Sequence, residues 1–310
     1  MQRRRKLLRK ASAKSQSAME YLMTYGWAIL IIAVVLAALF ELGVFNPMTF
    51  APKASPGSCQ VVRPEGAGTT NFISLEGECN GELPQYVASF QYSVSGNDGT
   101  GSFIRGSGLP ISGSSWTVSL WANSNEIGYP YEQNSGPSVT SSSCDEFILN
   151  QYGANLNVVT YGSPVATASS TSGAKLNTWQ MITFSASGGS SGTVSFYING
   201  QFISSNSLST QVPTGANWGW ALGMWGYCSG VAGRYGGLMS NVQIYNTLLS
   251  ANDIKALYQE GIGGAPINIQ SLVGWWPLNG NANDYSGNGN NGVPTNVIYT
   301  SNWYSGYSAP

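Results

Sequence analysis

The chain of 310 residues contains no histidine, which narrows the chemistry that its side chains can perform. Ser-His-Asp and Cys-His catalysis are excluded because both need an imidazole as general base. Glycoside hydrolysis needs two carboxylates about 5–10 Å apart, and the near matches are Glu76/Glu78 and Asp145/Glu146. The first pair precedes the main β-rich region, and the second pair would point to opposite faces of a strand. We therefore expect a non-enzyme.

A run of amide side chains around one carboxylate, from Asn281 to Asn290, is the best candidate for a metal site. Asp284 would supply a charged oxygen and Asn283 and Asn288 neutral oxygens, a set that suits Ca²⁺. Calcium sites usually contain more than one acidic residue. A loop shaped by Asx turns and glycines is therefore the alternative, and both interpretations stay open.

Four cysteines, Cys59, Cys79, Cys144 and Cys228, all follow the N-terminal apolar segment. An even number in an extracellular region suggests two disulfides. Zinc is the competing interpretation, but the chain has no Cys-x₂-Cys pair and no histidine. Of the three pairings, we favour Cys59–Cys79, which frames a short Gly-rich segment, and Cys144–Cys228, which links two stretches of the main domain.

A Gly-rich stretch carries the aromatic residues Trp218, Trp220, Trp225 and Tyr227. Exposed aromatic faces can stack on sugar rings or contact another protein. Alternating tryptophans in a β-rich region are more often part of the core. We treat the four residues as ligand-binding candidates with that alternative beside them.

Only 9% of the residues are charged, and seven of the 13 basic residues lie within the first fourteen positions. Removing these seven leaves 6 basic against 14 acidic side chains, a balance of −8. A nucleic-acid partner would need a basic face, so it is not expected.

The segment from Tyr21 to Phe40 has no charged residue and is mostly apolar. A helix of this length spans roughly 30 Å, the thickness of a bilayer core. Because basic flanks stay in the cytoplasm, the rest of the chain should lie outside the cell. The apolar segment is longer than the core of a secretory signal, which favours an anchor in the membrane.

The basic cluster ends in KSQSAMEY, residues 14–21, which resembles the class III signal peptide of archaeal type IV pilin-like proteins. The resemblance implies that a prepilin peptidase cuts between Ser15, where the family usually has Gly, and Gln16. It divides the segment into a leader, 1–15, and a helix, 16–45, that packs with homologous pilin subunits in a filament. Glu20 of a neighbour would then pair with the new ammonium at Gln16. A permanent anchor with Glu20 at the interface is the alternative.

Beyond the helix, residues 46–82 read as a Pro-containing linker and a cysteine-containing segment, and then the chain becomes β-rich. Alternating patterns predict strands separated by Gly, Ser and Asn clusters, which is typical of a sandwich or jelly roll. The strands are predicted at 86–94, 116–121, 147–149, 156–161, 180–185, 194–198 and 239–245. Asn199-Gly200 predicts a type I′ hairpin turn, and Ser250 begins a short helix that Gly261 ends.

Several of these pieces together resemble a laminin-G-like, concanavalin A-like domain over about residues 83–300. The segments on which the resemblance rests are ISGSSWTVSLWAN (111–123), LNTWQMITFS (176–185), VSFYINGQFI (194–203) and LMSNVQIYNTLLSANDIKALYQEG (238–261). The resemblance implies a two-sheet jelly roll that binds carbohydrate or protein surfaces. It also suggests a calcium loop near Asp284.

The segment LVGWWPLNGNANDYSGNGNNG, 272–292, usually opens such a domain, but here it follows one. It either closes the same sandwich or starts a second domain, for which the few residues after Gly292 are too short. We expect a sandwich over 83–310, closed by a strand within 272–300. The whole chain then resembles a pilin-like surface subunit or adhesin, held at the cell membrane with an extracellular C-terminal domain. A monomeric membrane-anchored lectin and a purely structural filament subunit are the alternatives.

Overall fold

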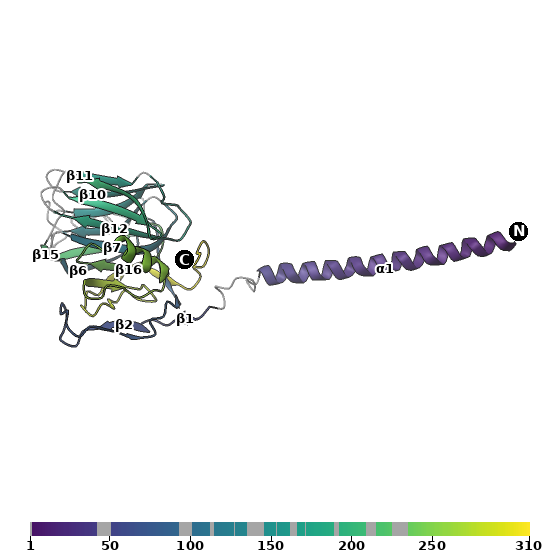
Figure 1. The fold of residues 1–310 in the computed structure, drawn as a ribbon, viewed down its shortest axis with the longest axis horizontal. Helices are drawn as coiled ribbons and strands as arrows, with labels where there is room; N and C mark the ends of the chain where they lie inside the picture. Colours follow the sequence, from purple (N-terminus) through teal and green to yellow (C-terminus); the bar gives the residue numbers. More distant parts are fainter. Residues whose placement is uncertain are drawn as a thin grey trace. The chain divides into compact units, whose positions relative to one another are not determined.

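The computed structural model describes two compact units, Met1–Ala51 and Pro52–Pro310, which are treated separately (Figure 1). The residues described are 2–41, 51–92, 101–111, 115–126, 128–134, 146–152, 154–161, 166–170, 172–188, 192–208, 215–224 and 235–310.

The first unit is one helix, α1 (Gln2–Glu41). Its part from Tyr21 to Glu41 has a mean hydropathy of 2.4 and is long and apolar enough to cross a membrane. No side chain in this part is buried, and Leu22 is 75% exposed. An apolar surface of this size needs lipid or another apolar surface to cover it in water.

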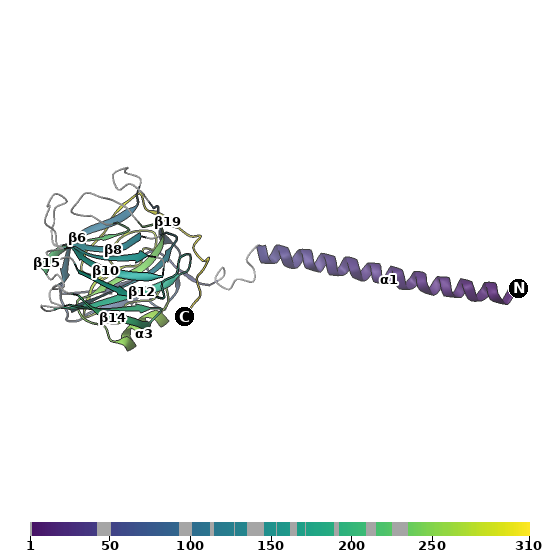
Figure 2. The ribbon, with the colours of Figure 1, turned by 90° about the horizontal axis from the view of Figure 1, so that it is seen from above.

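The second unit is a sandwich of two sheets in which neighbouring strands are antiparallel (Figures 1 and 2). The seven-stranded sheet contains, in spatial order, β11 (Ala166–Ser170), β10 (Asn155–Tyr161), β9 (Glu146–Tyr152), β8 (Gly128–Asn134), β15 (Gly215–Leu222), β6 (Phe103–Ile111) and β18 (Val293–Thr295). The eight-stranded sheet contains β14 (Gln201–Ser207), β13 (Thr193–Ile198), β12 (Gln180–Ser187), β7 (Ser115–Ser124), β16 (Gly237–Tyr245), β5 (Val87–Phe90) and β19 (Ile298–Thr300), with β17 (Leu272–Trp276) also paired to β16.

Two short pairs precede the sandwich in the chain. Strand β1 (Lys53–Ala54) lies parallel to β4 (Leu83–Pro84), and β2 (Cys59–Val62) lies antiparallel to β3 (Ser74–Gly77). We call residues 52–83 the N-terminal strap. The second compact unit begins at Pro52, and the strap packs on the sandwich. The division at residue 83 stays a prediction.

The jelly-roll class that the alternating patterns predict is confirmed, with the predicted strands present as β5, β7, β9, β10, β12, β13 and β16. The turn between β13 and β14 has positive φ at both Asn199 (51°) and Gly200 (74°), as a type I′ hairpin requires. Helix α3 (Ala251–Gln259) begins after Ser250, whose side chain forms a capping box with Asp253.

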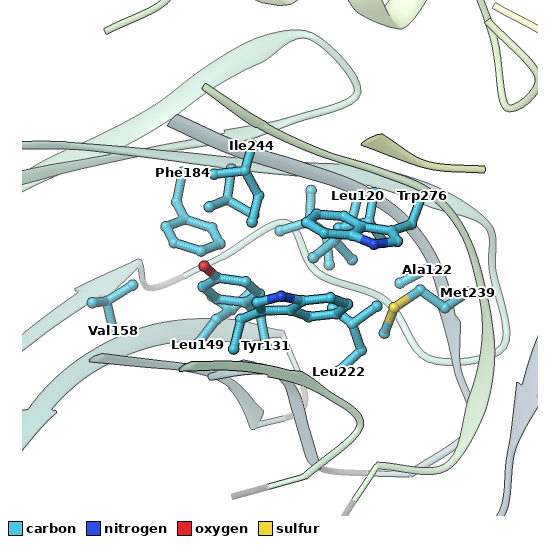
Figure 3. Close-up of a cluster of buried hydrophobic side chains, with 14 of the residues drawn as sticks. Leu120, Ala122, Tyr131, Leu149, Val158, Phe184, Leu222, Met239, Ile244 and Trp276 are labelled. Carbon is cyan, nitrogen blue, oxygen red and sulfur yellow. The ribbon is translucent and has the colours of Figure 1, made fainter. Parts of the chain in front are cut away.

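The inner core lies between the two sheets (Figure 3). Tyr131 and Leu222 of the seven-stranded sheet point toward Phe184 and Trp276 of the other sheet. Full burial of such side chains contributes about 1.5–3 kcal/mol each, which makes this cluster the main source of stability.

A second apolar cluster, called here the outer cluster, covers the other face of the eight-stranded sheet. The central strands β7, β12 and β16 are buried at nearly every position, so both of their faces are shielded. The covering side chains include Ile254 and Leu257 of α3, Val61 of the N-terminal strap and Trp303 near the C-terminus. Figure 2 shows α3 beside β14 at one edge of this sheet.

The last strands of the chain complete both sheets. Strand β17 pairs with β16, with Trp276 opposite Val242. Strand β18 then extends the seven-stranded sheet beside β6, and β19 extends the other sheet beside β5. Residues 272–300 therefore close this sandwich.

The buried tyrosines make stability depend on alkaline pH. Burial raises the pKa of Tyr131, Tyr235 and Tyr245 above the usual 10 and raises the pKa of Tyr299 to about 12. As pH rises, the unfolded chain loses these protons before the folded chain does. The tyrosines therefore do not lower the free energy of unfolding below pH 10, and they lower it increasingly above pH 10. Denaturant titrations from neutral pH to about pH 12 should show this fall.

Tyr235→Phe is the matched control, because it removes one raised pKa while keeping the ring, and it should make the alkaline fall smaller. Tyrosinate absorbance measured alongside circular dichroism checks the cause. Complete ionisation of the tyrosines near pH 10 with the fold intact would contradict the expectation.

Candidate functional site

The loop between β17 and β18, residues 277–292, contains the predicted metal ligands and is called the C-terminal loop. Asp284 lies at its centre. One carboxylate oxygen, Oδ1, accepts backbone N–H bonds from Trp275 (3.0 Å) and Ser286 (2.9 Å). The other, Oδ2, accepts from the backbone N–H of Asn290 (2.8 Å). The carboxylate therefore ties the loop to the end of β17.

Asn288 joins three segments. Its Nδ2 donates to the carbonyls of Leu272 (3.0 Å) and Val273 (2.9 Å), and its Oδ1 accepts from the backbone N–H of Gly68 in the N-terminal strap (2.9 Å). Asn283 is exposed, and its backbone N–H donates to Asn281 Oδ1 (2.9 Å) in an Asx turn. A loop shaped by Asx turns and glycines, the alternative to a calcium site, accounts for these contacts.

The fit of calcium to this loop is poor. Asp284 Oδ1 accepts two backbone N–H bonds, and Asp284 Oδ2 and Asn288 Oδ1 accept one each, so these three oxygens have few lone pairs left for an ion. The described residues include no group of three or more acidic or cysteine side chains that could hold a metal. Calcium stays a prediction, and the geometry that can be seen is that of a hydrogen-bonded loop.

Arg63 of the N-terminal strap is a clamp that the sequence patterns did not indicate. Its guanidinium is buried and donates to the carbonyls of Thr69, Ser286, Ile269 and Leu272. Burial lowers the pKa of Arg63 from its usual value, and the nearby charge of Asp284 partly offsets that shift. Figure 1 shows the strap strands β1 and β2 along the side of the sandwich that holds the C-terminal segments.

The strap is also closed covalently. Cys59 and Cys79 form a disulfide with their Cα atoms 5.0 Å apart. Cys144 and Cys228 lie outside the described residues, so their pairing stays a prediction. The sites at Ser15, Gln16 and Glu20 lie on the α1 backbone, and their side chains are likewise outside the description.

A small cavity of about 40 Å³ lies between the strap and the sandwich. Glu78 and Glu82 line it together with Trp275, Asn241 and Asn279. The two amides are already paired, since Asn241 Oδ1 accepts from Trp275 Nε1 (2.8 Å) and Asn279 Oδ1 accepts from the backbone N–H of Tyr86 (2.8 Å). The cavity has room for a few water molecules, and nothing in it marks a larger ligand.

The prediction that Trp220 binds a ligand is wrong. It is 0% exposed and packs in the inner core against Trp276, with ring centroids 4.2 Å apart. The alternation along β15 sends it inward, where no ligand can reach its face. Trp225 and Tyr227 lie outside the described residues, and only the backbone of Trp218 is described.

The outer face of the seven-stranded sheet exposes polar side chains on strands near its two edges, whereas Ala221 on strand β15, between them, is buried. Along β10, Leu156 and Val158 are buried whereas Asn155 is exposed and Asn157 is half-buried. On β6, Arg105 is exposed on the face opposite the buried Ile104. These positions present amides and a guanidinium, which can hydrogen-bond to a polar ligand.

The comparisons with known proteins agree with this architecture. A family model described as the concanavalin A-like lectin/glucanases superfamily matches residues 97–255, just over half of the chain. No curated protein sequence matches the chain. The fold is a two-sheet jelly roll, and the chain belongs to the concanavalin A-like lectin/glucanase superfamily.

Three solved structures illustrate the similarity. A candidate carbohydrate-binding protein from Bacteroides ovatus is 15% identical at a TM-score of 0.49, covering 71% of this chain and 61% of that one. A heptameric SAP-like pentraxin from Limulus polyphemus is 15% identical at 0.45, covering 69% and 94%. The CBM40 module of a Ruminococcus gnavus sialidase, bound to α2,3-sialyllactose, is 15% identical at 0.39, covering 50% and 93%.

The three hydrogen bonds that the Asp284 carboxylate accepts should stabilise the fold. Asp284→Ala leaves three backbone N–H groups without their acceptor, so we expect the free energy of unfolding to fall by about 2–4 kcal/mol. Denaturant unfolding in chelator and in added Ca²⁺ measures both effects. Asn283→Ala is the control and should leave stability in chelator unchanged. A Ca²⁺-dependent rise in melting temperature that both variants abolish would show that the loop binds the ion.

Proposed function

We propose that this protein is a cell-surface binding subunit in which a pilin-type helix holds a carbohydrate-binding jelly roll outside the cell. The observation that carries the proposal is the combination, in one chain, of an unburied apolar span from Tyr21 to Glu41 with a domain of the concanavalin A-like superfamily. The span suits a membrane, and later the same surface suits the dry core of a filament.

The helix part of the proposal rests on the residues before the span. A prepilin peptidase would cut between Ser15 and Gln16, which leaves Glu20 as the fifth residue of the mature chain. A charged amino terminus inside a filament core is costly unless it is paired. Glu20 of an adjacent subunit would supply that pair, and the interaction would set the axial position of one subunit against the next.

The proposal of carbohydrate binding rests on the family and on the exposed polar side chains of the seven-stranded sheet. Structures similar in fold include one described as a candidate carbohydrate-binding protein and one bound to sialyllactose, and these names support the class of ligand. In this chain Asn155 and Arg105 are exposed polar side chains on the outer face of the seven-stranded sheet, while α3 and the N-terminal strap cover the outer face of the other sheet. Many copies in one filament would turn weak sugar contacts into useful avidity.

Binding fits the chain better than catalysis. The absence of histidine removes the commonest general base. Glu76 and Glu78 are exposed on the strap, and the cavity that Glu78 lines has room for only a few water molecules. A monomeric anchored lectin and a purely structural filament subunit remain as outcomes of the experiments below.

Glu20→Ala tests the filament. The variant should still reach the membrane and be cut, but sheared cell material should contain no filaments with this subunit, because the terminal ammonium has lost its partner. Electron microscopy and mass analysis of the N-terminus measure both properties. Glu41→Ala, at the other end of the apolar span, is the control and should assemble normally. A chain found uncut and only in membrane vesicles would leave an anchored lectin-like protein.

Paired changes on the seven-stranded sheet test the ligand. Arg105→Ala with Asn155→Ala should weaken binding to immobilised oligosaccharides about tenfold, which corresponds to roughly 1.4 kcal/mol. Gln201→Ala, exposed on the edge strand β14, should leave binding unchanged. Intact filaments of the wild type that retain no saccharide would identify a purely structural subunit.

A further inference from the structure

The loop that joins β2 to β3, residues 63–73, holds Phe72 in an unusual state. Phe72 has a φ of 54° and is 79% exposed. It is more exposed than any other large apolar side chain in the described part of the chain, including Leu22 in the membrane-length helix at 75%.

This backbone conformation costs about 1–2 kcal/mol for a residue with a side chain. The other described non-glycine residues with positive φ fall into two kinds. Four are asparagines, which tolerate the conformation, and the fifth is Leu278, which is 1% exposed in the inner core. Packing therefore offsets the strain at Leu278. Phe72 has neither the tolerant side chain nor the burial.

The loop is fixed in place by contacts at several points. Arg63 donates to the carbonyl of Thr69, and the backbone N–H of Gly68 donates to Asn288 Oδ1 (2.9 Å). Ile73 packs against the outer cluster, and the disulfide closes the base of the hairpin. The Phe72 ring is thus presented to solvent by a fixed backbone, which lowers the entropy lost when a ligand binds.

We infer that Phe72 is a stacking platform for a neutral sugar ring, a contact that rests on the proposed carbohydrate-binding function and lies apart from the seven-stranded sheet. The negative face of an aromatic ring attracts the C–H groups on one face of a pyranose. Thr70 and Asn71 are exposed beside it and offer a hydroxyl and an amide for the sugar hydroxyls.

Charge and size select this ligand class. Residues 64–76 contain two acidic side chains, Glu65 and Glu76, and no lysine or arginine, and the guanidinium of Arg63 is buried against carbonyls. The loop therefore does not suit a phosphate, a sulfate or an anionic membrane. A protein partner needs a cluster of apolar anchors. Here the other exposed large apolar side chain in the stretch is Leu75, at 37%. One ring matches one sugar ring.

The test uses the full chain in micelles of a detergent without a sugar headgroup, on an array of immobilised neutral and acidic oligosaccharides. Phe72→Asn should melt at the same or a higher temperature, because asparagine tolerates positive φ. Its binding to the neutral saccharides that retain the wild type should fall at least tenfold. Phe72→Trp should keep binding. Binding is thus lost while stability is kept or raised, which a merely structural role for Phe72 does not produce.

Phe202→Asn is the matched control. Phe202 is 56% exposed on β14, has an ordinary backbone conformation and packs edge-on against Tyr197 with ring centroids 5.5 Å apart. Binding should survive this change. Equal loss in the Phe72 and Phe202 variants, or wild-type binding by Phe72→Asn, would overturn the inference.

The outcomes also separate this inference from the proposed function. Loss of binding in the Arg105/Asn155 variant but not in Phe72→Asn rejects the platform and keeps the carbohydrate-binding domain. A wild type that retains no saccharide rejects both. Binding to unglycosylated protein spots that depends on Phe72 would replace the sugar with a protein partner.

Discussion

Strand β16 has two edges but three neighbours, and the outer domain is organised around that constraint. One edge pairs with β7, while the other is shared by β5, opposite Gly237–Met239, and β17, opposite Val242–Tyr245. The change of partner occurs at Asn241, where φ is 48° and the pairing with β7 shifts. Its side chain donates to the carbonyl of Gly264 and accepts from Trp275 Nε1. One buried amide thus ties β16 to β17 and to the segment that follows α3.

The arrangement around β16 makes the ends of the domain depend on each other. Strand β17 leads into the C-terminal loop, and that loop leads into β18 and β19 at the edges of the two sheets. Asp284 fixes the loop to β17, and Arg63 fixes the N-terminal strap over the loop through carbonyls more than 200 residues away. Arg63 donates its hydrogen bonds to carbonyls and not to a carboxylate. Salt should therefore screen its contribution to stability only weakly.

Local patterns predicted most of the fold but less of the site. Alternation identified strands such as β7 and β16, and the Asn199-Gly200 pair predicted its turn, because these features depend on residues close in sequence. The same alternation could not say whether Trp220 lay in the core or on a surface, since both faces of a strand show period two. Arg63 and Phe72 gave no sequence signal, because their significance depends on distant carbonyls and on a backbone angle. The leader and Glu20 rest on resemblance.

The disulfide between Cys59 and Cys79 also decides how the domain would respond to force. A pull on the chain before Cys59 travels through the sulfur–sulfur bond to Cys79 and on to β5, which is paired on both sides, by β16 and β19. The residues between the two cysteines, with Arg63 among them, lie outside that covalent route. Tension on an anchored subunit would therefore bypass the hairpin and reach β5, next to the edge of the eight-stranded sheet, while the clamp over the C-terminal loop stays unstretched.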